Sequence, residues 1–262
     1  MTILQWFIFF IAIQLIHFGG SWKLYQKAGR KSWEALIPVY NAIVLMQIIR
    51  RPKWWVILLF IPIINLMIFP VVWVETLRSF GKNSSLDTAL GILTFGLYTY
   101  TINYNNATSY QADRSLVPRT WFGEWISALL FAITAATLVH NYFIQPYIIP
   151  TGSLEKTLLI GDFLFVSKFH YGARPPMTAL AFPMVHDTLP LVKTKSYLDF
   201  PQLPYFRLPG FQKVERNEIV VFSWPADTVR QFFVKEKGVR KPLDKKSNYV
   251  KRCVGIPGDT LS

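Results

Sequence analysis

The segment Tyr147-Ile-Ile-Pro-Thr-Gly-Ser-Leu-Glu-Lys-Thr-Leu-Leu-Ile-Gly-Asp162 lies where the chain changes character, and it decides how the two halves of the sequence are interpreted. Residues 1–145 are mostly apolar and hold 11 Lys and Arg with 5 Asp and Glu. Residues 146–262 form a shorter stretch than residues 1–145, yet they hold 17 Lys and Arg with 10 Asp and Glu. We therefore predict a membrane region followed by a domain that is mostly exposed to water, with the boundary near Pro146.

The composition supports a membrane protein. Of the 262 residues, 52% are hydrophobic and 16% are charged, whereas a typical soluble domain has roughly 25% charged residues. A net charge of +13 in such an apolar, aromatic chain favours cationic flanks of membrane spans over a nucleic-acid-binding surface. The single cysteine excludes a disulfide within the chain and a multi-cysteine metal site, and we expect neither a metal nor a cofactor.

Four stretches of the N-terminal half are apolar enough to be candidate membrane spans. They are residues 3–20, 54–76, 86–103 and 121–144. A helix needs about 20 residues to cross the hydrocarbon core, so the third stretch is marginal. Basic residues follow the first stretch but do not precede it, which is typical of a retained span and not of a cleaved signal peptide. We predict a multi-pass region over residues 1–120 and a transmembrane anchor over residues 121–145.

The basic residues predict the orientation of these spans. Residues 35–49 are a possible fifth span, but they are short and interrupted by Pro38 and Asn41. With four spans and the N-terminus outside, the inner loops hold nine basic residues and the outer loop holds two. A fifth span would move four of the nine outside, so the positive-inside rule favours four. Residues 146–262 then lie outside the cytoplasm.

Polar residues within or near these apolar stretches allow two interpretations. They are Asn41, Gln47, Asn65 and Glu75. Polar groups in a membrane region can mark a transport pathway. They also form the hydrogen bonds that hold packed helices together, which is the interpretation that we favour.

The C-terminal half has the pattern of short strands. Residues 163–167, 218–222 and 248–254 are apolar and rich in β-branched or aromatic side chains, and turn residues flank them. Residues 172–210 are rich in proline and aromatic residues, so we predict an extended insertion there.

Ser153 is a candidate nucleophile. It lies in a short polar loop between apolar residues, directly after the last predicted span, and Gly152 lets the backbone approach a substrate closely. The Ser153 N–H and the Thr151 hydroxyl are candidate donors to a developing oxyanion. The alternative is a serine that caps a turn, a common role for serine in loops.

A serine nucleophile needs a base, and here the candidate is a lysine. None of the four histidines lies in a recognisable triad pattern. Lys251 lies in the segment Asn248-Tyr-Val-Lys-Arg-Cys-Val-Gly-Ile-Pro-Gly-Asp259. In a strand, Tyr249, Lys251 and Cys253 share one face. Burial of an amine favours its neutral form, which can accept a proton. The alternative is a strand lysine whose amine reaches water.

Together the two segments resemble those of bacterial type I signal peptidase, a membrane-bound peptidase with a Ser/Lys dyad. The serine segment of that family is similar to Ile149-Pro-Thr-Gly-Ser-Leu-Glu-Lys-Thr-Leu158, and its lysine segment is similar to Tyr249-Val-Lys-Arg-Cys-Val-Gly-Ile-Pro-Gly-Asp259. A third segment, Arg216-Asn-Glu-Ile-Val-Val-Phe222, resembles a family strand between the two. The resemblance covers residues 121–262, and the long insertion resembles that of Bacteroidetes members.

The resemblance implies a mostly-β extracytoplasmic catalytic domain over residues 146–262, with the insertion at 172–210. It implies Ser153 as the nucleophile, Lys251 as the general base, and Thr151 with the Ser153 N–H as the oxyanion hole. Other residues match positions that line the small S1 and S3 pockets, which receive residues −1 and −3 of a signal peptide. They are Tyr147, Ile149, Pro150, Leu158, Tyr249 and Val250.

The sequence also departs from the family pattern. Leu154 stands where Met is usual, Lys156 where Pro is usual, and Asn217-Glu218 where Gly-Asp is usual. The family's last segment, with Gly-Asp-Asn and Ser-x-Asp-Ser-Arg features, does not occur before Ser262. We therefore expect a C-terminally truncated chain, which as it stands is an incomplete enzyme.

The N-terminal half resembles an uncharacterised multi-pass membrane domain that is sometimes fused to such peptidases. The resemblance rests on Ser32-Trp-Glu-Ala-Leu-Ile-Pro-Val-Tyr-Asn41 and Arg51-Pro-Lys-Trp-Trp55, and it implies no chemistry.

The family implies a membrane-bound serine endopeptidase, signal peptidase I, that removes signal peptides from exported preproteins. We expect it in the bacterial inner membrane with its catalytic domain on the periplasmic side. The expected partners are signal peptides, the lipid bilayer and the protein translocation machinery, and no nucleic acid. The alternative is a non-catalytic scaffold or transport-like protein with an extracytoplasmic binding domain, in which Ser153 and Lys251 lie far apart.

Overall fold

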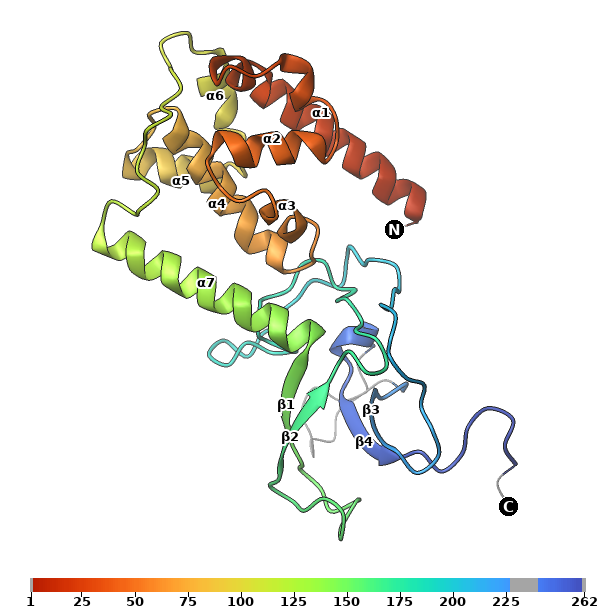
Figure 1. The fold of residues 1–262 in the computed structure, drawn as a ribbon. Coiled ribbons are helices and arrows are strands. Elements are labelled where there is room, and N and C mark those ends of the chain that lie inside the picture. Colours follow the sequence, from red (N-terminus) through yellow and green to blue (C-terminus); the bar gives the residue numbers. More distant parts are fainter. Residues whose placement is uncertain (1, 227–239, 261–262) are drawn as a thin grey trace. The chain divides into compact units, whose positions relative to one another are not determined.

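A computed structural model describes residues 2–226 and 240–260 of the chain (Figure 1). The chain forms two compact units, Met1–Phe131 and Ala132–Ser262.

The first unit is helical. Its helices are α1 (Ile3–Lys27), η1 (Ser32–Ala35), α2 (Tyr40–Ile48), α3 (Trp55–Leu58), α4 (Ile64–Ser79), α5 (Ser85–Leu93) and α6 (Thr99–Tyr104). Capping boxes mark two of the helix starts, because Thr2 pairs with Gln5 before α1 and Ser84 pairs with Asp87 before α5. Helix α1 packs against α6, and α4 packs against α5.

Two helices are long and apolar enough to cross a membrane, among the residues that the structure describes. They are α1 and α7 (Trp121–Tyr142), which correspond to the first and fourth predicted spans. The second predicted span is divided, because α3 ends at Leu58 and α4 begins only at Ile64. The third is divided between α5 and α6. The four-pass topology stays a prediction.

Glu75 in α4 lies at the centre of an ion cluster. Its carboxylate is 2.5 Å from Arg114, 3.1 Å from Arg78 and 3.3 Å from Arg51. Arg114 also donates hydrogen bonds to the Ser79 hydroxyl and to the backbone carbonyl oxygen of Ile49, directly after α2. These contacts tie the segment after α6 to α4, so Glu75 has a packing role in this structure.

The second unit continues from α7 into two antiparallel hairpins. Strand β1 (Ile144–Ile148) pairs with β2 (Phe163–Ser167), and β3 (Ile219–Ser223) pairs with β4 (Asn248–Arg252). The hairpins form two separate two-stranded sheets. The predicted strand at 163–167 is confirmed, and those at 218–222 and 248–254 are confirmed with shifted ends. Turns and irregular segments make up most of the other described residues of this unit, which leaves the mostly-β fold unconfirmed.

The predicted insertion, residues 172–210, folds back on itself through isolated bridges. These bridges pair Thr178 with Gln202, Ala181 with Tyr197, and Thr188 with Lys195. At its base, Gly172 has a φ of +84° and approaches the Leu208 carbonyl so closely that an added Cβ would lie 2.0 Å from the oxygen. Glycine is therefore required where the two ends of the insertion meet.

Candidate active site

Ser153 lies in a turn that is closed at its base by backbone hydrogen bonds. The Ile149 N–H donates to the Asp162 carbonyl at 3.0 Å, and the Gly161 N–H donates back to the Ile149 carbonyl at 2.9 Å. Ile149 itself is buried, whereas Ser153 is exposed. The turn is therefore anchored by an apolar residue at the end of β1 and presents the serine hydroxyl at the surface.

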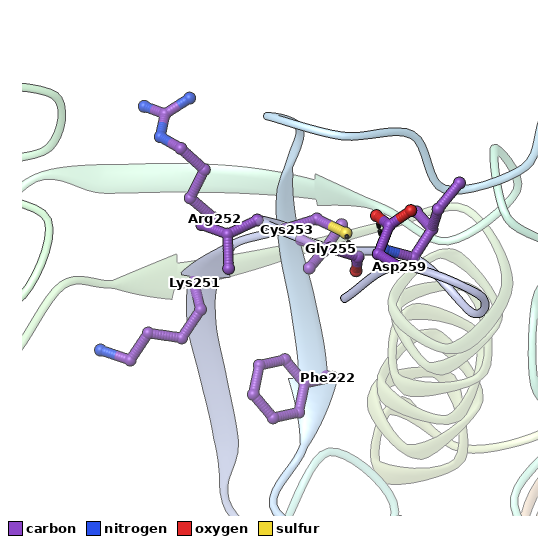
Figure 2. A pocket seen from close by; sticks show the side chains of 9 residues that line it. Phe222, Lys251, Arg252, Cys253, Gly255 and Asp259 are labelled. Atoms are coloured by element: carbon purple, nitrogen blue, oxygen red, sulfur yellow. Dashed lines mark hydrogen bonds between the residues drawn. The ribbon is translucent and has the colours of Figure 1, made fainter. Parts of the chain in front are cut away.

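Lys251 lies on β4, opposite Val220 of β3. The side chains on this face of the hairpin include Val220 and Phe222, and they line a shallow hollow with Lys251. Figure 2 shows the Arg252 side chain extending away from that of Lys251 on β4, with the Phe222 ring on the neighbouring β3. The alternation predicted for residues 249–253 is present.

The structure brings Ser153 and Lys251 together. Lys251 Nζ donates to Ser153 Oγ at 2.5 Å, across 98 residues of sequence. A base within hydrogen-bond reach of a hydroxyl is the geometry that proton abstraction requires. A second link lies beside it, because Arg252 donates to the Thr157 hydroxyl at 3.3 Å.

The predicted pocket residues fall into separate groups. Leu158 and Val250 line a hollow between the hairpins together with apolar side chains of β2 and β3. Tyr249 lies two residues before Lys251 on the same face of β4, and its ring packs on Trp224 with centroids 4.8 Å apart. Pro150 is exposed. Thr151 is exposed, and its place in an oxyanion hole stays a prediction.

Tyr147 reaches from β1 to β4, which the sequence did not predict. Asn248 Nδ2 donates to the Tyr147 hydroxyl at 2.9 Å, and this hydroxyl donates to Gln145 at 2.8 Å. Burial raises the pKa of Tyr147 to about 12, so the phenol stays neutral and able to donate. No spacing pattern marks Asn248 in the sequence; its one signal is its place at the start of the lysine segment.

Two cations lie near Tyr147. Lys168 Nζ is 5.7 Å from the Tyr147 ring centroid. Burial and the nearby Arg174 guanidinium lower the pKa of Lys168 to about 8.

In residues 2–226 and 240–260 we find no group of three His, Cys, Asp or Glu side chains arranged to hold a metal ion.

Comparison with known proteins assigns the C-terminal half to a family. Residues 122–262 match the family of signal peptidase, peptidase S26, which is more than half of the chain. The chain therefore belongs to this peptidase family. Residues 33–113 match a second family, DUF5684, whose function is unknown, in agreement with the resemblance to an uncharacterised domain.

Individual relatives carry a more specific name. The chain is similar to signal peptidase I of Buchnera aphidicola, with 28% identity over 160 residues, 61% of this chain and 37% of the relative. Signal peptidase I of Rickettsia massiliae is 30% identical over 53% of this chain and 38% of its own length. Signal peptidase I of Pseudomonas aeruginosa is 28% identical over 53% of this chain and 33% of its own length. The chain thus spans about a third of the length of these relatives. No solved structure matches it.

Proposed function

We propose that this chain carries the catalytic dyad of a membrane-bound serine endopeptidase that removes signal peptides from exported preproteins. The observation that carries the proposal is the 2.5 Å contact between Lys251 Nζ and Ser153 Oγ in a chain that belongs to the signal peptidase family. A non-catalytic binding domain gives no reason for a serine in a turn and a lysine in a distant strand to meet in this way.

The first half of the proposed reaction forms an acyl-enzyme. The neutral amine of Lys251 takes the proton of the Ser153 hydroxyl, and Oγ attacks the scissile carbonyl carbon of the preprotein. The resulting oxyanion accepts hydrogen bonds from the Ser153 N–H and the Thr151 hydroxyl. The C–N bond then breaks, and the Lys251 ammonium gives its proton to the leaving amine. The mature protein leaves with a new N-terminus.

The second half releases the signal peptide. Lys251, again neutral, takes a proton from a water molecule, which attacks the ester carbon of the acyl-enzyme. The ester bond breaks, Ser153 Oγ regains a proton from Lys251, and the signal peptide leaves with a free carboxylate. This cycle uses no metal or cofactor.

We further propose that α7 anchors the catalytic region in the bacterial inner membrane. Ser153 follows the end of α7 by 11 residues (153 − 142), so the nucleophile stays near the membrane surface where a translocated signal peptide presents its cleavage site. The pocket residues Tyr147, Ile149, Leu158 and Val250 favour small side chains at −1 and −3. The catalytic region lies on the periplasmic side in this proposal, next to the lipid bilayer and the translocation machinery.

The test is cleavage of a preprotein by the full-length protein reconstituted in vesicles. Lys251→Arg keeps a cation of similar length but removes the titratable amine, because a guanidinium stays protonated. We expect Lys251→Arg and Lys251→Met to lower kcat by about 10²–10⁴, the usual contribution of a general base, and Ser153→Ala to abolish cleavage.

The matched control is Lys213→Met, which removes an exposed lysine of the same unit and should cleave at the unaltered rate. If Lys251→Arg retains more than about a tenth of the activity, where a lost base predicts far less, the dyad is wrong. If Ser153→Ala still cleaves, the serine is not the nucleophile.

A further inference from the structure

The segment that leads into β4 contains buried charges. Residues 241–246, which include the short helix η2 (Leu243–Lys245), come directly before the strand that carries Lys251. The side chains of Lys241 and Lys245 are buried in this segment, with 7% and 5% of each residue exposed. Buried cations are costly unless other groups compensate them, so the surroundings of these lysines determine whether the segment holds its position.

The insertion, residues 172–210, supplies the partners of both lysines. Lys241 Nζ forms a 2.7 Å ion pair with Asp187. Lys245 Nζ lies 5.3 Å from the Tyr197 ring centroid, within the range of a cation–π contact. It also donates to the Val185 carbonyl at 3.4 Å. Each buried cation before β4 is thus compensated by a residue of the insertion.

Asp244 adds a two-point contact between the same segments. The Thr178 backbone N–H donates to one carboxylate oxygen of Asp244, and the Thr178 hydroxyl donates to the other, each at 3.0 Å. Thr178 is fully buried. Hydrogen bonds to a carboxylate are stronger than those between neutral groups, so this pair fixes η2 against the insertion in one arrangement.

A chain of hydrogen bonds extends these contacts to both hairpins. Arg174 of the insertion donates to the Ser223 hydroxyl on β3 at 2.9 Å, and this hydroxyl lies 3.3 Å from the Asn248 side-chain oxygen on β4. Asn248 then donates to Tyr147 on β1. The last two members of this series are close to the dyad in sequence, since Asn248 precedes Lys251 by three residues and Tyr147 precedes Ser153 by six.

We infer that the insertion is a positioning element of the active site. The two hairpins are separate sheets, so their relative position depends on side-chain contacts and not on strand pairing. By fixing the segment before β4, the insertion sets the approach of Lys251 Nζ to Ser153 Oγ. A displacement of about 1 Å between reacting groups can cost 10²-fold in rate. The inference rests on the proposed function.

The test compares variants of the full-length protein in the preprotein cleavage assay, with rates normalised to the folded fraction. Thr178→Val keeps the side-chain shape but removes the hydroxyl that Asp244 accepts from, and Asp187→Asn removes the charge that pairs with Lys241. We expect each to lower kcat by about tenfold with KM unchanged, since a shift well under 1 Å is enough for that loss. Thr178→Ser, which restores the hydroxyl, should recover the rate.

Asp199→Asn is the matched control, because Asp199 forms a 2.8 Å ion pair with Lys195 within the same insertion but is 59% exposed. It should cleave like the unaltered protein. Normal kcat in folded Thr178→Val and Asp187→Asn overturns the inference while leaving the dyad intact, and so does a change confined to KM. If the unaltered protein does not cleave the preprotein, the proposed function is wrong, and the inference that rests on it is wrong as well.

Discussion

Replacing Glu75 by glutamine removes a carboxylate that three arginine side chains contact in the helical unit. Arg114, Arg78 and Arg51 lie 2.5, 3.1 and 3.3 Å from it, and Glu75 and Arg114 each have only 6% of their side chains exposed. With the carboxylate, the cluster has a net charge of +2 (three arginines and one glutamate). Glu75→Gln raises it to +3 and leaves the arginines to repel one another.

The expected loss of folding stability follows from the burial of Glu75 and Arg114. An ion pair at 4 Å contributes about 4 kcal/mol at the effective dielectric constant of a protein near its surface. Removing one partner of a buried pair costs about 3–5 kcal/mol, because the other charge is left uncompensated. We therefore expect Glu75→Gln to lower the free energy of unfolding by about 3–5 kcal/mol and the melting temperature by roughly 10 °C.

The assay is thermal unfolding of the full-length protein in detergent, followed by tryptophan fluorescence. Asp113→Asn is the control, because it removes an exposed carboxylate next to Arg114 in sequence and should change the melting temperature little. Adding Arg51→Gln to Glu75→Gln returns the net charge to +2 and should recover part of the loss, which a double-mutant cycle measures. Equal melting of Glu75→Gln and the unaltered protein would refute the argument that the cluster needs its carboxylate.

Two further predictions concern the second unit. Burial and Arg174 lower the pKa of Lys168 from 10.5 to about 8, so the unfolded chain binds more protons between these values and stability rises with pH across that window. Lys168→Met should remove this rise and stabilise the protein at pH 7 by roughly 2 kcal/mol, allowing for screening by solvent; an unchanged pH slope in chemical denaturation would contradict this. Gly172→Ala should destabilise the insertion by more than about 2 kcal/mol, since its Cβ meets the Leu208 carbonyl oxygen at 2.0 Å. Gly161→Ala shares the positive φ but meets nothing within 4 Å, so limited proteolysis should show a clearly smaller effect.

Local signals predicted the strands better than the helix ends. Residues 163–167 alternate between aromatic and aliphatic side chains within turn residues, and they form β2 with the predicted bounds. The apolar stretch after Trp121 has no residue that marks where α7 stops, so the prediction placed Ile144 in the span, whereas it begins β1. Hydropathy is averaged over a window of residues, so it does not detect a local break in a helix. One such break is at Ile63, which lies between α3 and α4 and has a φ of +70°.

The site was only partly accessible from the sequence. The segments around Ser153 and Lys251 were recognisable because their residue order resembles a family, but composition does not encode a contact across 98 residues. Asn248 and Asp244 were missed because their partners, Tyr147 and Thr178, are far away in sequence and belong to elements whose packing no periodicity describes.

The division of the dyad between two hairpins has a consequence for biosynthesis. A ribosome that adds about 5–20 residues per second completes the serine loop roughly 5–20 s before it reaches the lysine strand, which follows 98 residues later. On the proposed assignment, the nascent protease is latent throughout this interval. It becomes competent to cut only after the later strand has been made and has brought Lys251 to Ser153.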